Sequence, residues 1–106
     1  MRITVLAIPG CPNVPVTLER LDAALAGRKA EVVSVEVRDE AEAARRGMAG
    51  SPTVLLDGQD PFARTDSVPG VACRIYRHLD GTTDGAPSTD ELREALTAAG
   101  MASGHS

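Results

Sequence analysis

Residues 3–14, which read ITVLAIPGCPNV, decide the fold of this 106-residue chain. Their first half is a short run of aliphatic and β-branched residues that a Pro-Gly pair ends, a pattern typical of a buried parallel strand. A helix is predicted directly afterwards, because apolar residues recur at helical spacing from Val14 to Leu25. The thiol of Cys11 is therefore expected between the end of a strand and the beginning of a helix.

Further strands and helices follow, and the whole chain reads as β-α-β-α-β-β-α. A strand–helix–strand unit gives parallel strands and a hairpin adds antiparallel ones, so this order predicts an α/β fold with a four-stranded mixed sheet flanked by helices on both faces. One domain covers residues 1–99, and residues 100–106 are predicted to form a flexible tail. The later elements are predicted as strands at 31–37, 53–56 and 73–77, a helix at 39–46, a loop at 59–72, and a final helix that a capping box at 88–91 opens.

Composition and charge exclude several classes of partner. The net charge of −4 argues against nucleic acid or an anionic membrane, because both require a basic surface. With one Phe, one Tyr and no Trp, the core must be aliphatic, and aromatic stacking on bases or sugars is not expected. The N-terminal apolar run is too short for a signal peptide or a membrane span, which favours a cytoplasmic protein. Two cysteines form neither a disulfide framework nor a four-thiolate metal site.

A second motif, residues 50–54 (GSPTV), opens the third predicted strand. Together with residues 10–14 (GCPNV) it resembles the thioredoxin fold, in which a cysteine at a helix start faces a cis-proline that precedes a strand. More narrowly, the chain resembles small thioredoxin-like proteins of high-GC, actinobacterial type, which share the Gly-Cys-Pro-Asn start and the segment matched here by residues 57–62 (DGQDPF). The resemblance extends over residues 2–99, nearly the whole chain.

The resemblance implies a role for each motif residue. Cys11 corresponds to the attacking cysteine and Pro52 to the cis-proline. The family pattern has a second cysteine three residues after the first, and Val14 occupies that position here. A mixed disulfide on Cys11 therefore cannot be resolved within the motif, and an external thiol is expected to resolve it. The residues that would help to hold a bound thiol or peptide are Pro12, Ser51, Pro52 and Thr53.

The position of Cys11 also has a direct physical consequence. A helix N-terminus stabilises a thiolate through its free N–H groups and the positive end of its dipole. Pro12 suits the first helical position, where a missing N–H has no cost. We therefore expect Cys11 to ionise more readily than a free cysteine. The alternative interpretation is a small apolar side chain buried near a strand end, as free cysteines often are.

The second cysteine and the histidines are less informative. Cys73 opens the fourth predicted strand, about 13 Å from the end of the neighbouring strand that carries Pro52. Bridged cysteines need Cα atoms within about 7 Å, so Cys73 reads as a buried structural thiol rather than a partner of Cys11, although it is a candidate second thiol. His78 could accept a proton from Cys11 or be a solvated residue at a strand end, and His105 reads as inert. No spacing indicates a metal site.

Three functional hypotheses follow. The first is a monothiol oxidoreductase in which Cys11 exchanges with a protein disulfide or a low-molecular-weight thiol and needs no bound cofactor. The second is a protein that binds a soft metal or an organomercurial through Cys11, with or without Cys73. The third is a partner-binding module in which the surface beside Pro52 acts without redox chemistry. The sequence leaves the substrate, the pathway and the oligomeric state undetermined.

Overall fold

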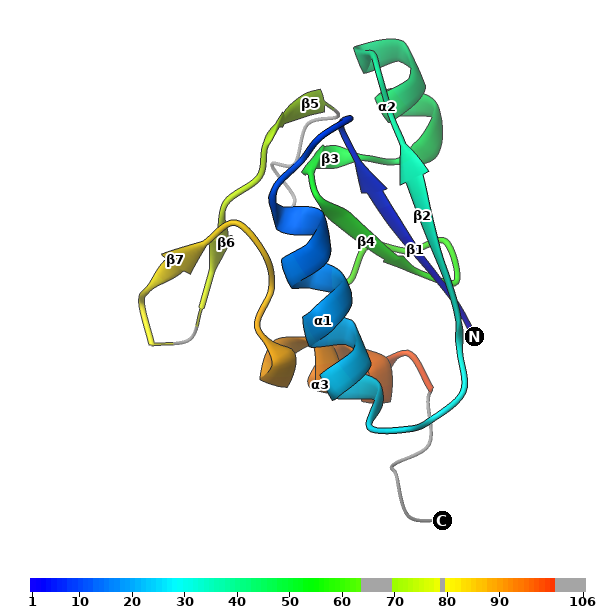
Figure 1. Cartoon of the computed structure of the whole chain (residues 1–106), viewed down its shortest axis with the longest axis vertical. Coiled ribbons are helices and arrows are strands. Elements are labelled where there is room, and N and C mark those ends of the chain that lie inside the picture. The colour runs from blue at the N-terminus through cyan, green and yellow to red at the C-terminus, as the bar shows by residue number, and fades with distance from the viewer. Residues whose placement is uncertain (64–69, 79, 101–106) are drawn as a thin grey trace.

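A three-stranded sheet forms the centre of the structure, a computed structural model that describes residues 1–63, 70–78 and 80–100. Strand β1 lies in the middle of this sheet, parallel to β2 and antiparallel to β4 (Figure 1). Parallel neighbours require a crossover connection, and helix α1 provides it between β1 and β2. The elements are β1 (Arg2–Ala7), α1 (Asn13–Leu25), β2 (Glu31–Glu36), α2 (Glu40–Arg46), β3 (Ala49–Ser51), β4 (Thr53–Leu56), β5 (Gly70–Cys73), β6 (Tyr76–Arg77), β7 (Thr83–Asp84) and α3 (Thr89–Ala98).

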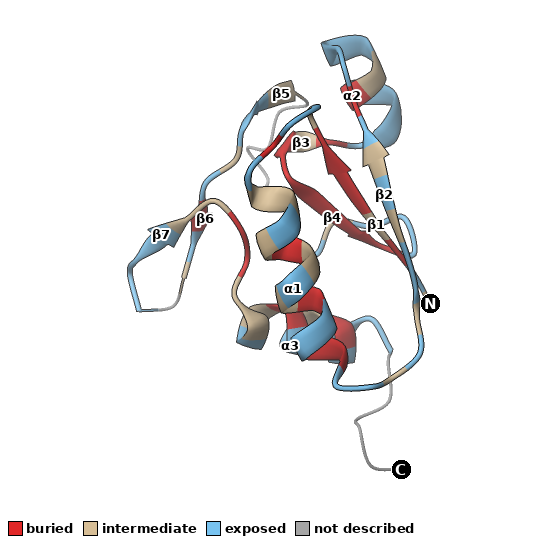
Figure 2. Cartoon of the chain, in the orientation of Figure 1, coloured by how far each residue is buried: buried red, intermediate tan, exposed pale blue. Residues whose placement is uncertain are grey.

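Alternation along β1 gives the sheet two apolar faces. Ile3 and Val5 pack with α1 and α3 on one face, whereas Leu6 packs with α2 on the other. Figure 2 shows the buried residues concentrated on β1, on β4 and on the facing side of the helices. The α/β class is therefore confirmed. The first cluster contains Ile3, Val5, Leu21, Ala24, Leu25, Val54, Leu56, Leu92 and Leu96, and the second contains Leu6, Val37, Ala43, Met48 and Leu55.

Helices α2 and α3 each begin at a side chain that caps the first turn. The Asp39 carboxylate accepts a hydrogen bond from the N–H of Glu42 at 2.7 Å. At α3 the cap is reciprocal: the N–H of Glu91 donates to Ser88 Oγ at 3.1 Å, and the N–H of Ser88 donates to Glu91 Oε1 at 3.0 Å. The capping box predicted at residues 88–91 is thus present. None of the helices in the described part of the chain has the length and hydropathy needed to cross a bilayer.

Removing the cap of α3 is expected to destabilise the chain measurably. Ser88→Ala should lower the free energy of unfolding by about 1 kcal/mol, because the N–H of Glu91 loses its acceptor. Urea denaturation of both proteins measures the difference. Thr89→Ala at the next position is the matched control, and an equal loss in that variant would show that the cap itself is not responsible.

Among the described residues, the central sheet has three strands and not the four predicted. Residues 73–77 do not make one strand beside β4: β5 pairs in parallel with β3, and β6 pairs with β7. Alternating exposure is present in this segment, with Arg74 and Tyr76 facing inward while Cys73 and Ile75 face outward. The segment takes this orientation because Arg74 finds a buried carboxylate partner in Asp60, so its charge is compensated inside the fold.

Two other predictions are affected by which residues the structure describes. The predicted loop at 59–72 is a turn in its first residues and becomes β5 from Gly70 onward, while 64–69 lie outside the described residues. The predicted tail at 100–106 lies outside them from residue 101, and so does His105. The Asp-Gly-x-Asp-Pro-Phe segment at 57–62 is described throughout, and it supplies the buried partner of Arg74.

Candidate functional site

Cys11 lies in the short connection between β1 and α1. Its N–H donates to the carbonyl of Ile8 at 3.2 Å, which closes a turn, and its carbonyl accepts from the N–H of Val14 at 3.3 Å. Pro12 is the N-cap of α1 and is exposed, with no side-chain hydrogen bond at the cap. The thiol side chain is free but only 7% exposed. The structure thus places Cys11 at the N-terminus of the helix as predicted, but Pro12 is the cap rather than the first helical residue, so Cys11 lies one residue outside the cap.

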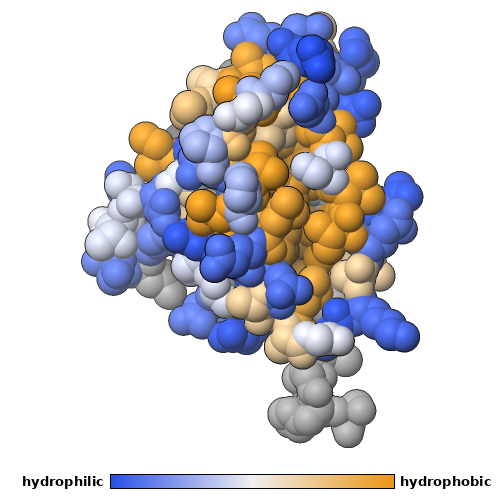
Figure 3. Space-filling view, in the orientation of Figure 1, coloured by the Kyte–Doolittle hydropathy of each residue, from blue (hydrophilic) through white to orange (hydrophobic). Residues whose placement is uncertain are grey.

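A small pocket lies beside Cys11. Its volume is about 270 Å³, and it opens between the first turn of α1 and the end of β2. Figure 3 shows apolar side chains gathered over the part of the sheet that α1 and β2 border. The pocket is therefore suited to a small, largely apolar group next to the thiol. Its lining residues are Ala7, Ile8, Gly10, Cys11, Val14, Pro15, Ser34, Val35 and Glu36.

The second motif approaches the Cys11 connection through one hydrogen bond. The Ser51–Pro52 peptide bond is cis, the isomer that the resemblance implied. Ser51 Oγ accepts from the N–H of Ile8 at 3.1 Å, so the residue before the proline is tied to the turn that carries Cys11. The side chains of Ser51, Pro52 and Thr53 are all buried.

The backbone around Pro52 is engaged by the chain itself. The Tyr76 hydroxyl donates to the carbonyl of Pro52 at 2.6 Å. Burial raises the pKa of Tyr76, although Arg74 acts in the opposite direction, so the phenol stays protonated and remains a donor. Thr53 Oγ1 donates to the carbonyl of Gly50 at 2.6 Å and accepts from the N–H of Ala49 at 3.2 Å.

Arg74 is the centre of a buried polar cluster behind these residues. Its guanidinium lies 2.6 Å from the Asp60 carboxylate, and the two side chains are 10% and 8% exposed. The same group donates to the carbonyl of Phe62 at 2.8 Å and lies 4.7 Å from the centre of the Tyr76 ring. The rings of Phe62 and Tyr76 meet edge to face at 5.6 Å. This cluster holds the chain after β5 against the residues on both sides of Pro52.

Cys73 is not where the sequence predicted it. It is exposed rather than buried, and it pairs in register with Ser51, immediately before Pro52, instead of lying at the far end of the neighbouring strand. The reason is that β5 runs parallel to β3 and is not the return strand of a hairpin with β4. Both thiols are free.

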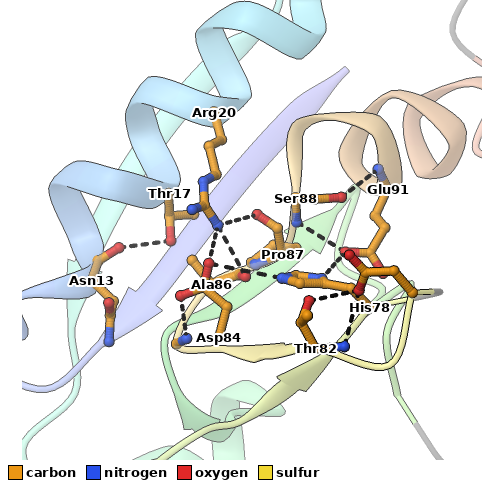
Figure 4. A network of polar contacts seen from close by, with 12 residues as sticks. Asn13, Thr17, Arg20, His78, Thr82, Asp84, Ala86, Pro87, Ser88 and Glu91 are labelled. Atoms are coloured by element: carbon orange, nitrogen blue, oxygen red, sulfur yellow. Dashed lines mark hydrogen bonds and ion pairs between the residues drawn. The ribbon is translucent and has the colours of Figure 1, made fainter.

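His78 belongs to a network of its own, drawn in Figure 4. Its Nδ1 lies 2.6 Å from Glu91 and its Nε2 lies 3.8 Å from Asp84, which also pairs with Arg20 at 2.8 Å. The network joins α1, β7 and the first turn of α3. Because both ring nitrogens face carboxylates, His78 is neither the proton acceptor for Cys11 nor the solvated residue that the sequence suggested; its side chain is only 15% exposed.

The carboxylates of this network make the free energy of unfolding depend on pH in the acidic range. The hydrogen bond from Arg20 lowers the pKa of Asp84. Burial raises the pKa of Glu91, but hydrogen bonds from Ser88 and His78 outweigh it, so the pKa lies below its ordinary value. A carboxyl with a lowered folded-state pKa stabilises the fold above its unfolded-state pKa, and this stabilisation is lost as the pH falls through the folded value.

We therefore expect Glu91→Gln to lower the free energy of unfolding less at acidic pH than at neutral pH. Gln keeps the capping-box acceptor but removes the charge beside His78. The difference in unfolding free energy between the two proteins should be present at pH 7 and shrink as the pH falls below about 4.3, the ordinary pKa of Glu. Urea denaturation at a series of pH values measures it, with Glu94→Gln as a control on the same helix. A difference that stays constant down to pH 3 contradicts this account.

Some residues of this site were predicted from the sequence and others were not. Cys11, Ser51 and Pro52 are brought together through Ile8. Arg74, Asp60 and Tyr76 were missed, because the partner of Arg74 lies 14 residues earlier in the chain and no local pattern marks the pair. Among the described residues, no group of three or more His, Cys, Asp or Glu side chains is placed to hold a metal ion. The sequence matches no protein-family model and no curated protein, and the structure matches no solved structure.

Proposed function

We propose that this chain is a thioredoxin-like protein that performs thiol–disulfide exchange through Cys11. One observation supports the proposal above the others. A free cysteine at the N-terminus of α1 is joined through Ile8 to Ser51, the residue that forms a cis peptide bond with Pro52. The parallel β1–α1–β2 crossover and the antiparallel β4 that follows Pro52 agree with the same fold family.

The proposed reaction has two steps. The Cys11 thiolate attacks one sulfur of a disulfide, the S–S bond of that disulfide breaks, and the leaving thiolate takes a proton from water. Cys11 is then held in a mixed disulfide. A second thiolate then attacks the substrate sulfur that is bonded to Cys11, a new disulfide forms between these two groups, and Cys11 is released as a thiolate. Val14 provides no second thiol, so the second thiolate comes from outside the motif.

The pocket beside Cys11 favours a small substrate. With a volume of about 270 Å³ it fits one amino-acid-sized arm of a low-molecular-weight disulfide. The thiol itself is largely buried, so the attacked sulfur must enter this pocket or displace its lining. A low-molecular-weight disulfide meets this requirement more readily than a folded protein does.

Adduct formation tests the proposal. A Cys73→Ser protein is incubated with glutathione disulfide, and intact-mass spectrometry with peptide mapping locates the product. We expect one mixed disulfide, on Cys11, that a reducing thiol removes. Cys11→Ser is the matched control and should give no adduct on the peptide that contains residue 11. No adduct in Cys73→Ser, or one that forms only after unfolding, contradicts the proposal.

A further inference from the structure

The edge of β3 next to Pro52 is occupied by β5. The N–H of Gly70 donates to the carbonyl of Met48 at 3.1 Å, and the N–H of Arg74 donates to the carbonyl of Ser51 at 2.9 Å. These two bonds mark the beginning and the end of the parallel β3–β5 pair. A partner chain cannot pair with this edge while β5 lies there, because an edge strand has only one free side for pairing.

This pairing brings Cys73 to the residue that contacts the Cys11 turn. Cys73 is the register partner of Ser51, and neighbouring strands lie about 4.8 Å apart. Paired residues of adjacent strands direct their side chains to the same face of the sheet. Ser51 Oγ accepts from Ile8, whose carbonyl in turn accepts from Cys11. The two thiols therefore belong to two segments that meet at one serine.

We propose that Cys73 is the thiol that resolves adducts on Cys11. This inference rests on the proposed function, because it needs a mixed disulfide on Cys11. The Cys73 thiolate attacks the Cys11 sulfur, the bond from Cys11 to the small thiol breaks, and that thiol leaves with a proton from water. The product is a Cys11–Cys73 disulfide. Two molecules of an external thiol then reduce it, restore both cysteines and become a disulfide themselves.

The contrast in burial supports this division of roles. Cys11 is largely buried beside the pocket, whereas Cys73 is exposed, so an adduct on Cys11 fills the pocket while Cys73 stays accessible. Arg74 fixes the position of Cys73, because its backbone is bonded to Ser51 and its side chain to Asp60. A bridge requires Cα atoms within about 7 Å. Cys73 must therefore approach Cys11 across Ser51 to within this distance for the bridge to form.

A tethered thiol should act faster than a dilute external one. Effective concentrations across short connections are in the millimolar range. With an external thiol at about 0.1 mM, the glutathione adduct on Cys11 should be lost roughly tenfold faster in the unchanged chain than in Cys73→Ser. The unchanged chain should also yield a cross-linked peptide pair that contains Cys11 and Cys73.

The matched control moves the thiol by one residue. In the double variant Ala72→Cys, Cys73→Ala, the new thiol lies one residue earlier in β5, out of register with Ser51. We expect this variant to keep a stable adduct on Cys11, as Cys73→Ser does. Ala72 is exposed, so the exchange does not disturb the core.

The outcomes separate the two proposals. If Cys73→Ser forms the adduct and the unchanged chain forms the Cys11–Cys73 disulfide, both are supported. If both proteins keep the adduct equally long, or if the Ala72→Cys control resolves it as fast as Cys73 does, the role of Cys73 is overturned and exchange at Cys11 stands. If Cys73→Ser forms no adduct, the proposed function itself fails, and this inference fails with it.

Discussion

Replacing Arg74 with alanine is expected to lower the free energy of unfolding by about 3–5 kcal/mol, a large part of the stability of a chain this small. The side chains of Arg74 and Asp60 are 10% and 8% exposed, so removing one charge leaves the other buried without compensation. The substitution also removes a donor to the carbonyl of Phe62 and the contact with the face of Tyr76. Urea denaturation of the two proteins measures the loss.

Two further variants test whether the loss comes from the buried position and the shape of the Arg74 side chain. Arg93→Ala breaks a pair with Asp90 in which the side chains are 51% and 86% exposed, and it should cost less than about 1 kcal/mol. Arg74→Lys keeps the charge but cannot reproduce the fork that reaches both Asp60 and Phe62, so its loss should lie between the other two. If Arg74→Ala destabilises no more than Arg93→Ala, the buried cluster does not hold β5 in place.

Gly50→Ala should have the second largest effect, about 2–4 kcal/mol of unfolding free energy. Gly50 has a φ of +99°, which L-residues rarely adopt. An added Cβ would also lie 2.9 Å from Arg74 Cβ and 3.2 Å from the carbonyl oxygen of Ala72. The methyl group would therefore press β3 and β5 apart at the register that pairs Ser51 with Cys73. Resolution of the Cys11 adduct should slow in the same variant.

Gly58→Ala separates the backbone cost of a positive φ from the crowding of an added Cβ. Gly58 has a φ of +87°, but nothing lies within 4 Å of a Cβ placed there. Only the backbone cost of about 1–2 kcal/mol is expected at this position. A loss at Gly50 no greater than the loss at Gly58 would show that β3 and β5 are not as closely packed as the structure has them.

Much of the first half of the chain could be predicted from its sequence. The run at residues 3–8 and the valines at 31–37 are apolar and β-branched, and their intervening helix carries its apolar residues at helical spacing. Local patterns of this kind determine the parallel β1–α1–β2 unit, the cap of α2 and the position of Cys11 at a helix start, and the capping box of α3 is the one comparable local signal in the second half. Each of these features depends on residues close together in the chain.

The second half could not be predicted in the same way, because its pairings depend on distant residues. Nothing near Arg74 in sequence indicates that its charge has a buried partner, since Asp60 belongs to another segment. Without that partner, the segment around Cys73 reads as a hairpin strand, and Cys73 is placed at the wrong end of the sheet. The parallel pairing of β5 with β3 moves it beside Ser51.

The measurement that tests the proposed function most directly is the rate at which iodoacetamide alkylates Cys11 at neutral pH in the folded Cys73→Ser protein, compared with the same protein unfolded in urea. Cys73 in the Cys11→Ser protein provides the comparison within the same chain. If Cys11 is the attacking thiol, it reacts in the folded protein, and at least as fast as the exposed Cys73. Reaction at Cys11 only after unfolding, or more slowly than at Cys73, would contradict an attacking role for Cys11 and favour a module that acts without redox chemistry.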